Sequence, residues 1–167
     1  NSELFSAGFN PVGEQQIALQ AGSGGLELVN TSLFALSNGG RTGATINLSS
    51  EGDISMISEE DRQLVSTGTS SDLSGGDIFI AAPGDLSLQG SFSISSDSTG
   101  PGDGGIVSLT GRDVELIQTG SEATPTSIGS LTTGSGTGGT IFIAAEEDLV
   151  VAGRHVFSST TAGPGNS

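Results

Sequence analysis

The chain of 167 residues contains no Cys, Trp, Tyr or Lys, and it has one Met and one His. Without cysteine it has neither a disulfide framework nor a cysteine-based zinc site. No segment approaches the roughly 20 consecutive apolar residues of a membrane-spanning helix, so we expect no membrane insertion. The start, Asn1-Ser2-Glu3, shows no basic segment followed by an apolar one. This favours a chain whose leader was removed, or a segment of a longer exoprotein.

Positive charge is scarce, because four arginines face 19 acidic residues and give a net charge of -15. Binding to phosphate requires clustered Lys and Arg, so the composition argues against nucleic acid and anionic membranes as partners. Two interpretations of the acidity stay open. It keeps a strand-rich surface soluble, or it attracts divalent cations.

Residues 75–104 recur 63 positions later as residues 138–167, with identities at fifteen of thirty positions and no gap. Most identities are glycines, strand-type aliphatic residues or turn residues, so the repeated unit is structural. Looser copies precede and separate these two. We place the repeats at approximately 14–42, 43–74, 75–103, 104–137 and 138–167, and together they form a single domain spanning 1–167.

Each copy contains two short segments in which apolar and polar residues alternate, and a third, weaker one follows. A period of two is typical of strands with one buried face. The first segments begin at Ile17, Ile46, Ile78, Val107 and Ile141. Each copy then ends in a stretch rich in Gly, Ser and Thr, which predicts long loops near residues 65–76, 97–105, 119–138 and 160–167.

Three short strands and one long Gly/Ser/Thr loop per copy predict an all-β fold, a parallel β-helix of about five coils. Stacked coils complete one another's hydrogen-bond ladders and fill a continuous interior. The inward positions of the alternation give the expected core: Ile46, Leu48, Ile78, Ile80, Leu86, Leu88, Val107, Leu109, Ile141 and Ile143. Among these we expect Ile80 and Ile143 to be fully buried.

The segment 75–105 runs from Gly75-Gly76-Asp77-Ile78-Phe79-Ile80 through Gly84-Asp85-Leu86 to Gly100-Pro101-Gly102-Asp103-Gly104-Gly105. It resembles the repeats of filamentous-haemagglutinin-type exoproteins, especially those of cyanobacterial surface proteins. The resemblance covers residues 39–167 well and the first 38 residues loosely. It implies two-partner secretion, a right-handed β-helical rod, an extracellular or cell-surface location, and a role as adhesin, matrix fibre or scaffold. The Asn-Pro turns of the family's export domain are echoed only at Asn10-Pro11, so export recognition is not assigned to this segment.

An acidic residue precedes the second strand in four copies, and in register these residues form a ladder: Asp53, Asp85, Asp113 and Asp148. Like charges about 4.8 Å apart repel one another unless they are bonded or screened. One interpretation is an Asx turn, in which each carboxylate accepts a hydrogen bond from the backbone N–H two residues on. The other is calcium bridging between rungs, which suits oxygen-only ligands. We expect the turn and no cofactor.

Phe79 and Phe142 lie between inward isoleucines, so strand alternation directs both outward. Either the chain's own long loop covers them, or they contact a partner such as another chain or a carbohydrate.

An enzyme is the third class of function, because the same fold occurs in polysaccharide lyases and hydrolases. Their chemistry needs a basic residue beside clustered carboxylates. Here Arg112 adjoins Asp113 and Arg154 adjoins His155, and alternation along a strand would separate the members of each pair. We therefore expect a structural or adhesive module rather than an enzyme. Its partners would be copies of itself, adjoining repeats of the same chain, or a surface polysaccharide.

Overall fold

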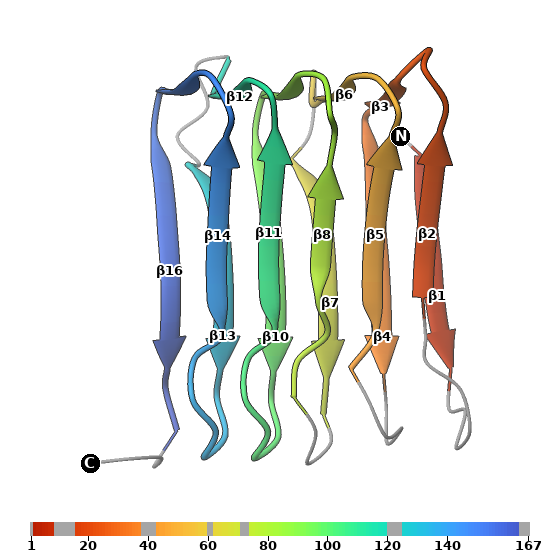
Figure 1. The fold of residues 1–167 in the computed structure, drawn as a ribbon. Helices are drawn as coiled ribbons and strands as arrows, with labels where there is room; N and C mark the ends of the chain where they lie inside the picture. Colours follow the sequence, from red (N-terminus) through yellow and green to blue (C-terminus); the bar gives the residue numbers. More distant parts are fainter. Residues whose placement is uncertain are drawn as a thin grey trace.

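The computed structural model describes residues 2–8, 16–37, 43–59, 62–70, 74–119 and 125–163. These residues form three parallel sheets, so the expected β-helix of about five coils with three strands per coil is confirmed (Figure 1). None of the described residues is helical. Within these ranges, accordingly, no helix is long and apolar enough to cross a membrane.

Each coil passes through sheets B, C and A in that order, and each sheet stacks the equivalent strand of successive coils. Sheet A contains β1 (Ser2–Gly8), β4 (Thr31–Ser37), β7 (Gln63–Thr69), β10 (Phe92–Ser98), β13 (Thr126–Thr132) and β16 (His155–Thr161). Sheet B contains β2 (Gln16–Ala21), β5 (Thr45–Ser50), β8 (Ile78–Ala81), β11 (Ile106–Gly111) and β14 (Thr140–Ala145). Sheet C contains β3 (Leu26–Val29), β6 (Ile54–Ile57), β9 (Leu86–Gln89), β12 (Val114–Ile117) and β15 (Leu149–Ala152).

The register agrees with the sequence alignment of the copies. In sheet B, Ile78 pairs with Ile46 on one side and with Val107 on the other, and Val107 pairs with Ile141. Sheet C shows the same agreement, because Leu86 pairs with Ile54 and Val114. A slip of one residue would turn every inward aliphatic side chain outward, so the buried face fixes this register.

The core lies inside the stack and consists mainly of aliphatic side chains from all three sheets. Eight of the ten expected core residues are buried: Ile46, Leu48, Ile78, Ile80, Leu86, Leu88, Val107 and Leu109. Ile141 and Ile143 are only partly buried and pack against the edge of this core. The expectation that Ile143 is fully buried was therefore wrong. It lies in β14, which among the described strands pairs only with β11.

Sheet A contains two strands that the sequence analysis missed. β13 lies inside the segment 119–138, which was predicted to be a loop, and β1 precedes the first predicted copy. The ends of β7, β10 and β16 also extend into predicted loops. The alternation of apolar and polar residues is weak in sheet A because half of the inward residues carry hydroxyls, such as Ser96, Ser130 and Thr132.

These inward hydroxyls donate hydrogen bonds to backbone carbonyl groups at the corner where sheet A leads into sheet B. The hydroxyls of Thr67 and Ser96 donate to the Gly76 carbonyl at 2.8 and 2.5 Å, and Ser130 donates to the Gly105 carbonyl at 3.0 Å. A Cβ at Gly76 would collide with the backbone of Ala44 in the coil before. The recurring Gly-Gly is therefore required by the close approach of successive coils.

Candidate functional site

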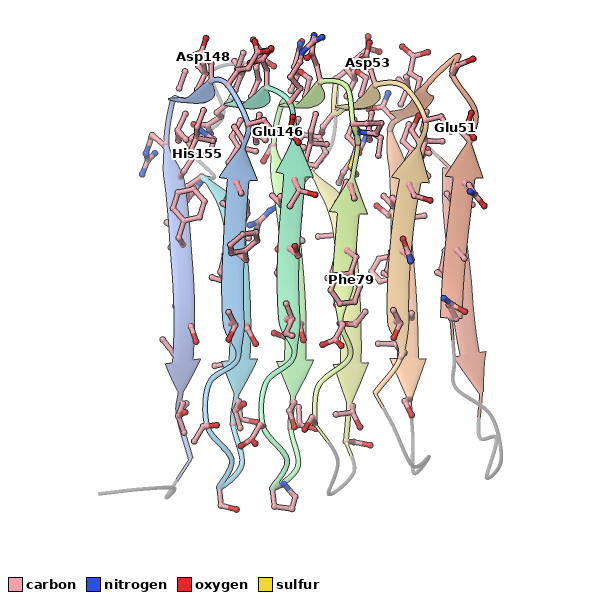
Figure 2. All side chains as sticks on the ribbon, in the orientation of Figure 1. Glu51, Asp53, Phe79, Glu146, Asp148 and His155 are labelled. Atoms are coloured by element: carbon pink, nitrogen blue, oxygen red, sulfur yellow. The ribbon has the colours of Figure 1, made fainter. Side chains whose placement is uncertain are left out.

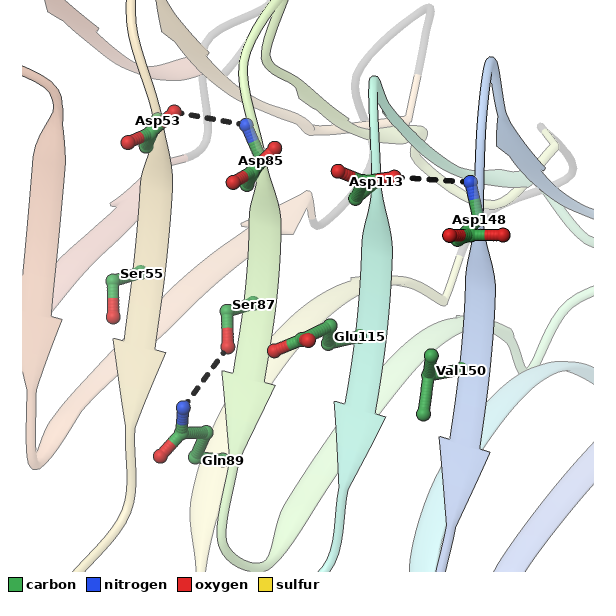
Figure 3. A pocket seen from close by; sticks show the side chains of 9 residues that line it. All are labelled: Asp53, Ser55, Asp85, Ser87, Gln89, Asp113, Glu115, Asp148 and Val150. Atoms are coloured by element: carbon green, nitrogen blue, oxygen red, sulfur yellow. Dashed lines mark hydrogen bonds between the residues drawn. The ribbon is translucent and has the colours of Figure 1, made fainter.

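The four aspartates of the ladder lie in the turns between sheets B and C, on successive coils. Asp53 Oδ1 accepts a hydrogen bond from the Asp85 backbone N–H at 2.9 Å, and Asp113 Oδ1 accepts one from the Asp148 N–H at 3.0 Å (Figure 3). For Asp53 and Asp113 the expected Asx turn was therefore wrong. These bonds cross to the next coil, because the equivalent turns stack directly and present their N–H groups to the carboxylate below.

A similar arrangement recurs at the corner that leads from sheet A into sheet B, and the sequence analysis missed it. Asp77 Oδ1 accepts from the Ile106 N–H at 2.8 Å, and Asp103 Oδ1 accepts from both the N–H and the hydroxyl of Thr137. These hydrogen bonds lower the pKa of Asp103, the backbone bond contributing most. Polar turn residues therefore continue the inter-coil hydrogen bonding where the strand ladders are interrupted.

A groove of about 430 Å³ runs along the outer face of sheet C (Figure 3). The aspartate ladder forms one rim, and the outward side chains of β6, β9, β12 and β15 form the floor: Ser55, Ser87, Gln89, Glu115 and Val150. Figure 2 shows acidic residues, among them Asp53, Glu146 and Asp148, at this end of the strands. Within the described ranges, no group of three or more His, Cys, Asp or Glu residues is arranged to hold a metal ion.

Arg112 lies within the ladder, contrary to the expectation that it would diverge from the neighbouring carboxylates. Its guanidinium is 2.6 Å from Asp85 Oδ1 and 3.6 Å from Asp113 Oδ2. Arg112 and Asp113 belong to a turn, so the alternation of strand residues does not apply to them. The hydrogen bond to Asp85 and the charge of that carboxylate raise the pKa of Arg112. Arg112 and the two carboxylates therefore converge on one outer corner, the arrangement that the sequence analysis associated with polysaccharide-cleaving enzymes.

His155 and Arg154 lie at the opposite corner of the last coil. His155 is the first residue of β16, and its ring stacks on Phe157 with centroids 6.2 Å apart. Its Nε2 lies 2.9 Å from the carbonyl oxygen of Ala152. Both contacts position the ring at the turn, and neither brings a carboxylate to it.

Phe79 and Phe142 point outward from sheet B, on either side of Ser108 in the ladder. Phe79 is half-buried near the middle of β8 (Figure 2), whereas Phe142 is 52% exposed. Loop cover, the simpler of the two expectations, therefore does not hold for Phe142. The pair forms an apolar strip on one outer face.

Another apolar surface lies on the last coil, β14 to β16. β14, β15 and β16 each pair with a strand on one side only. Large apolar side chains are exposed here that correspond to buried residues in the coil before: Leu149, Val151 and Phe157 align with Val114, Leu116 and Ile128. The sequence analysis counted Ile141 and Ile143 of this coil as core, but both are only partly buried.

The fold and these surfaces define a β-solenoid scaffold, a stack of repeated coils with its core inside and its turns tied from coil to coil. Comparison of the chain with known protein families, curated proteins and solved structures finds no match.

Proposed function

We propose that this chain is a structural module of an extracellular scaffold or fibre and that it assembles by stacking on its last coil. The open end of β14, β15 and β16 carries the proposal. Among the described residues it exposes apolar side chains of the kind that fill the interior of the earlier coils, on three strands that each pair on one side only. This face can stack on another molecule or on further repeats of the same chain. Such a surface favours association because each unpaired edge is a template for another strand.

The proposed location outside the cell follows from the resemblance of residues 75–105 to filamentous-haemagglutinin-type repeats. The net charge of -15 supports a rod that stays soluble and does not associate sideways.

Native mass spectrometry combined with negative-stain imaging tests the proposal over a concentration series. We expect assemblies longer than one molecule, and we expect Phe142→Asp combined with Ile143→Pro to shorten or abolish them while the earlier coils stay folded. Leu64→Asp is the matched control, because Leu64 is an exposed apolar residue of a middle coil. Single molecules at every concentration would overturn the proposal.

Binding of a surface polysaccharide is the second candidate, and the outward strip of Phe79 and Phe142 favours it. Aromatic faces on one surface offer stacking platforms to sugar rings. Titration calorimetry with soluble polysaccharides would show binding that is lost in Phe79→Ala with Phe142→Ala. Binding that survives both substitutions would assign it to another surface.

A further inference from the structure

The outer face of sheet B carries two aromatic side chains with a small side chain between them. Phe79 in β8 and Phe142 in β14 both lie opposite Ser108 in β11, the strand that separates β8 from β14. Adjacent strands of a sheet are about 4.8 Å apart, so the backbone positions of the two phenylalanines are about 9.6 Å apart. The short side chain of Ser108 leaves a space between the two aromatic side chains, and we call this space the β11 slot.

The width of the β11 slot suits one inserted ring. Non-bonded carbon atoms are in contact at about 3.5 to 4.0 Å, so a ring with an aromatic side chain on each face requires about 7 to 8 Å. Phenylalanines on adjacent strands would fill this space themselves. Phenylalanines two strands apart leave room for a ring and can contact both of its faces. The slot therefore favours a ligand that is built from rings with apolar faces, as sugars are.

A hollow continues the β11 slot toward the corner where sheet B leads into sheet C. Its volume is about 240 Å³, and it is lined by Ala82, Thr110, Gly111, Ala144, Ala145 and Glu146. Thr110 is the next outward residue of β11 after Ser108. In β14, Ala144 follows Phe142 in the same way and pairs with Thr110. The hollow and the slot therefore adjoin, and the hollow adds one hydroxyl and one carboxylate to the surface of the slot.

The other end of the β11 slot is apolar. Ile106, the outward residue of β11 before Ser108, is 41% exposed although β11 pairs with a strand on both sides. Along β11 the face therefore offers an aliphatic side chain, then the aromatic slot, then the polar hollow. A further coil on β14 would lie beside Phe142 and would leave the space over β11 open. The site therefore does not depend on what adjoins β14.

The hollow carries negative charge. Glu146 is exposed directly after β14 (Figure 2), and its backbone N–H donates to the Gly111 carbonyl at 3.1 Å, which holds the residue at the rim. The chain contains no Lys. Arg112, in the turn after β11, already pairs with Asp85 and Asp113. A cationic group of a ligand therefore complements the hollow better than an anionic group does.

We propose that the β11 slot and its hollow bind a polysaccharide of amine-bearing sugars, with one sugar ring between Phe79 and Phe142 and its ammonium group at Glu146. This inference rests on the second candidate function, polysaccharide binding by the strip of Phe79 and Phe142, and it names the class of sugar. The hydroxyls of Ser108 and Thr110 bond to hydroxyls of the sugar, and neighbouring sugars follow β11 across the rod. Polysaccharides of acidic sugars are repelled by Glu146 and by the net charge of -15.

Short oligosaccharides of glucosamine and of N-acetylglucosamine give the first test, because they share a backbone and differ in the charge on nitrogen. Titration calorimetry at mildly acidic pH, where the sugar amine is protonated, measures both affinities. We expect the glucosamine oligomer to bind about tenfold more tightly, since a hydrogen bond between charged groups is stronger than one between neutral groups. An oligomer of galacturonic acid, which carries a carboxylate on each sugar, should not bind.

Four variants assign the binding to this site. Glu146→Gln should remove the tenfold preference and leave the affinity for the N-acetylglucosamine oligomer unchanged. Glu147→Gln is its matched control, because it makes the same charge change outside the lining of the hollow. Ser108→Leu fills the slot and should abolish binding of both oligomers. Ser87→Leu is the control for it, since Ser87 is also an outward serine of a middle coil, on sheet C. Circular dichroism checks that each variant is folded.

The outcomes separate this inference from the proposed functions. A preference for the glucosamine oligomer that is lost in Glu146→Gln alone, with no binding to Ser108→Leu, supports the inference. Equal affinities for the two oligomers that are lost in Ser108→Leu overturn the amine preference and leave polysaccharide binding standing. An equal loss in Glu147→Gln shows general attraction to an acidic surface and overturns the site. No binding of any oligomer overturns the inference and counts against the second candidate, while the scaffold function, which rests on β14 to β16, stands.

Discussion

The coil formed by β11, β12 and β13 and the last coil, β14 to β16, share their register and their inward pattern, but they differ in burial. Val114 is fully buried and its ladder partner Leu149 is half exposed. Nothing in the last coil's own sequence causes the difference. In a solenoid a side chain is buried largely by the neighbouring coils, and Leu149 has a described neighbouring coil on one side only.

Truncating equivalent isoleucines in a middle coil and in the last coil should give the largest difference in unfolding free energy. Ile80→Ala leaves a void between two coils and should cost about 2 to 5 kcal/mol of unfolding free energy. Ile143→Ala removes a partly exposed side chain and should cost about 1 kcal/mol. Urea denaturation monitored by circular dichroism measures both. Equal costs would show that the last coil is buried as deeply as the others.

A second contrast concerns glycines at two kinds of turn. Gly76→Ala places a Cβ against the backbone of Ala44 and should cost about 1 to 3 kcal/mol through overpacking. Gly24→Ala meets nothing within 4 Å and should leave stability nearly unchanged. Thermal unfolding of the two variants side by side decides the point. A neutral Gly76→Ala would mean that the corner can relax without the Gly-Gly pair.

The sequence predicted sheets B and C well, because their inward residues are aliphatic and recur at fixed positions such as Ile46, Ile78 and Val107. It failed for β13, where inward Ser130 and Thr132 remove the apolar alternation on which the method depends. The inter-coil bonds of Asp53 and Asp113 could not be predicted either. They depend on how two turns stack, and a Gly-Asp pair has the same sequence in an ordinary Asx turn.

A smaller difference in stability is expected between a carboxylate that accepts a hydrogen bond from the next coil and one that does not. Asp53→Ala removes the acceptor of the Asp85 N–H in the next coil and should cost about 0.5 kcal/mol, since the bond is exposed. Asp148→Ala should cost less, because no described residue donates a backbone N–H to its carboxylate, as Asp85 does to that of Asp53. Differential scanning calorimetry measures the loss of stability in both variants. A larger loss for Asp148 would assign that residue a different role.

The same instrument tests the calcium interpretation of the ladder. If the aspartates only complete inter-coil hydrogen bonds, adding calcium or a chelator leaves the melting temperature unchanged. A calcium-dependent rise that disappears in Asp85→Asn would show that the ladder holds a cation.

The smallest expected effect is a pair of opposite pKa shifts on neighbouring elements. Hydrogen bonds from Thr137 lower the pKa of Asp103, so the stability that this residue contributes is lost as the pH falls through its folded-state pKa. Burial raises the pKa of Asp97, so its contribution declines as the pH rises from the ordinary value to the raised one. A carbon-detected NMR titration of the side-chain carboxyls should give Asp97 a higher pKa than Asp103. The reverse order would contradict the assigned hydrogen bonds.

Hydrogen exchange resolved by segment tests the central claim most directly, because it compares the last coil with the middle of the stack in one sample. At low protein concentration the amides of β14, β15 and β16 should exchange much faster than those of β8 and β11, because one side of each strand is open. Raising the concentration should slow exchange in the last coil, as its edges become paired. Protection of the last coil equal to that of β8 at every concentration would contradict the claim that this coil is the open, associating end.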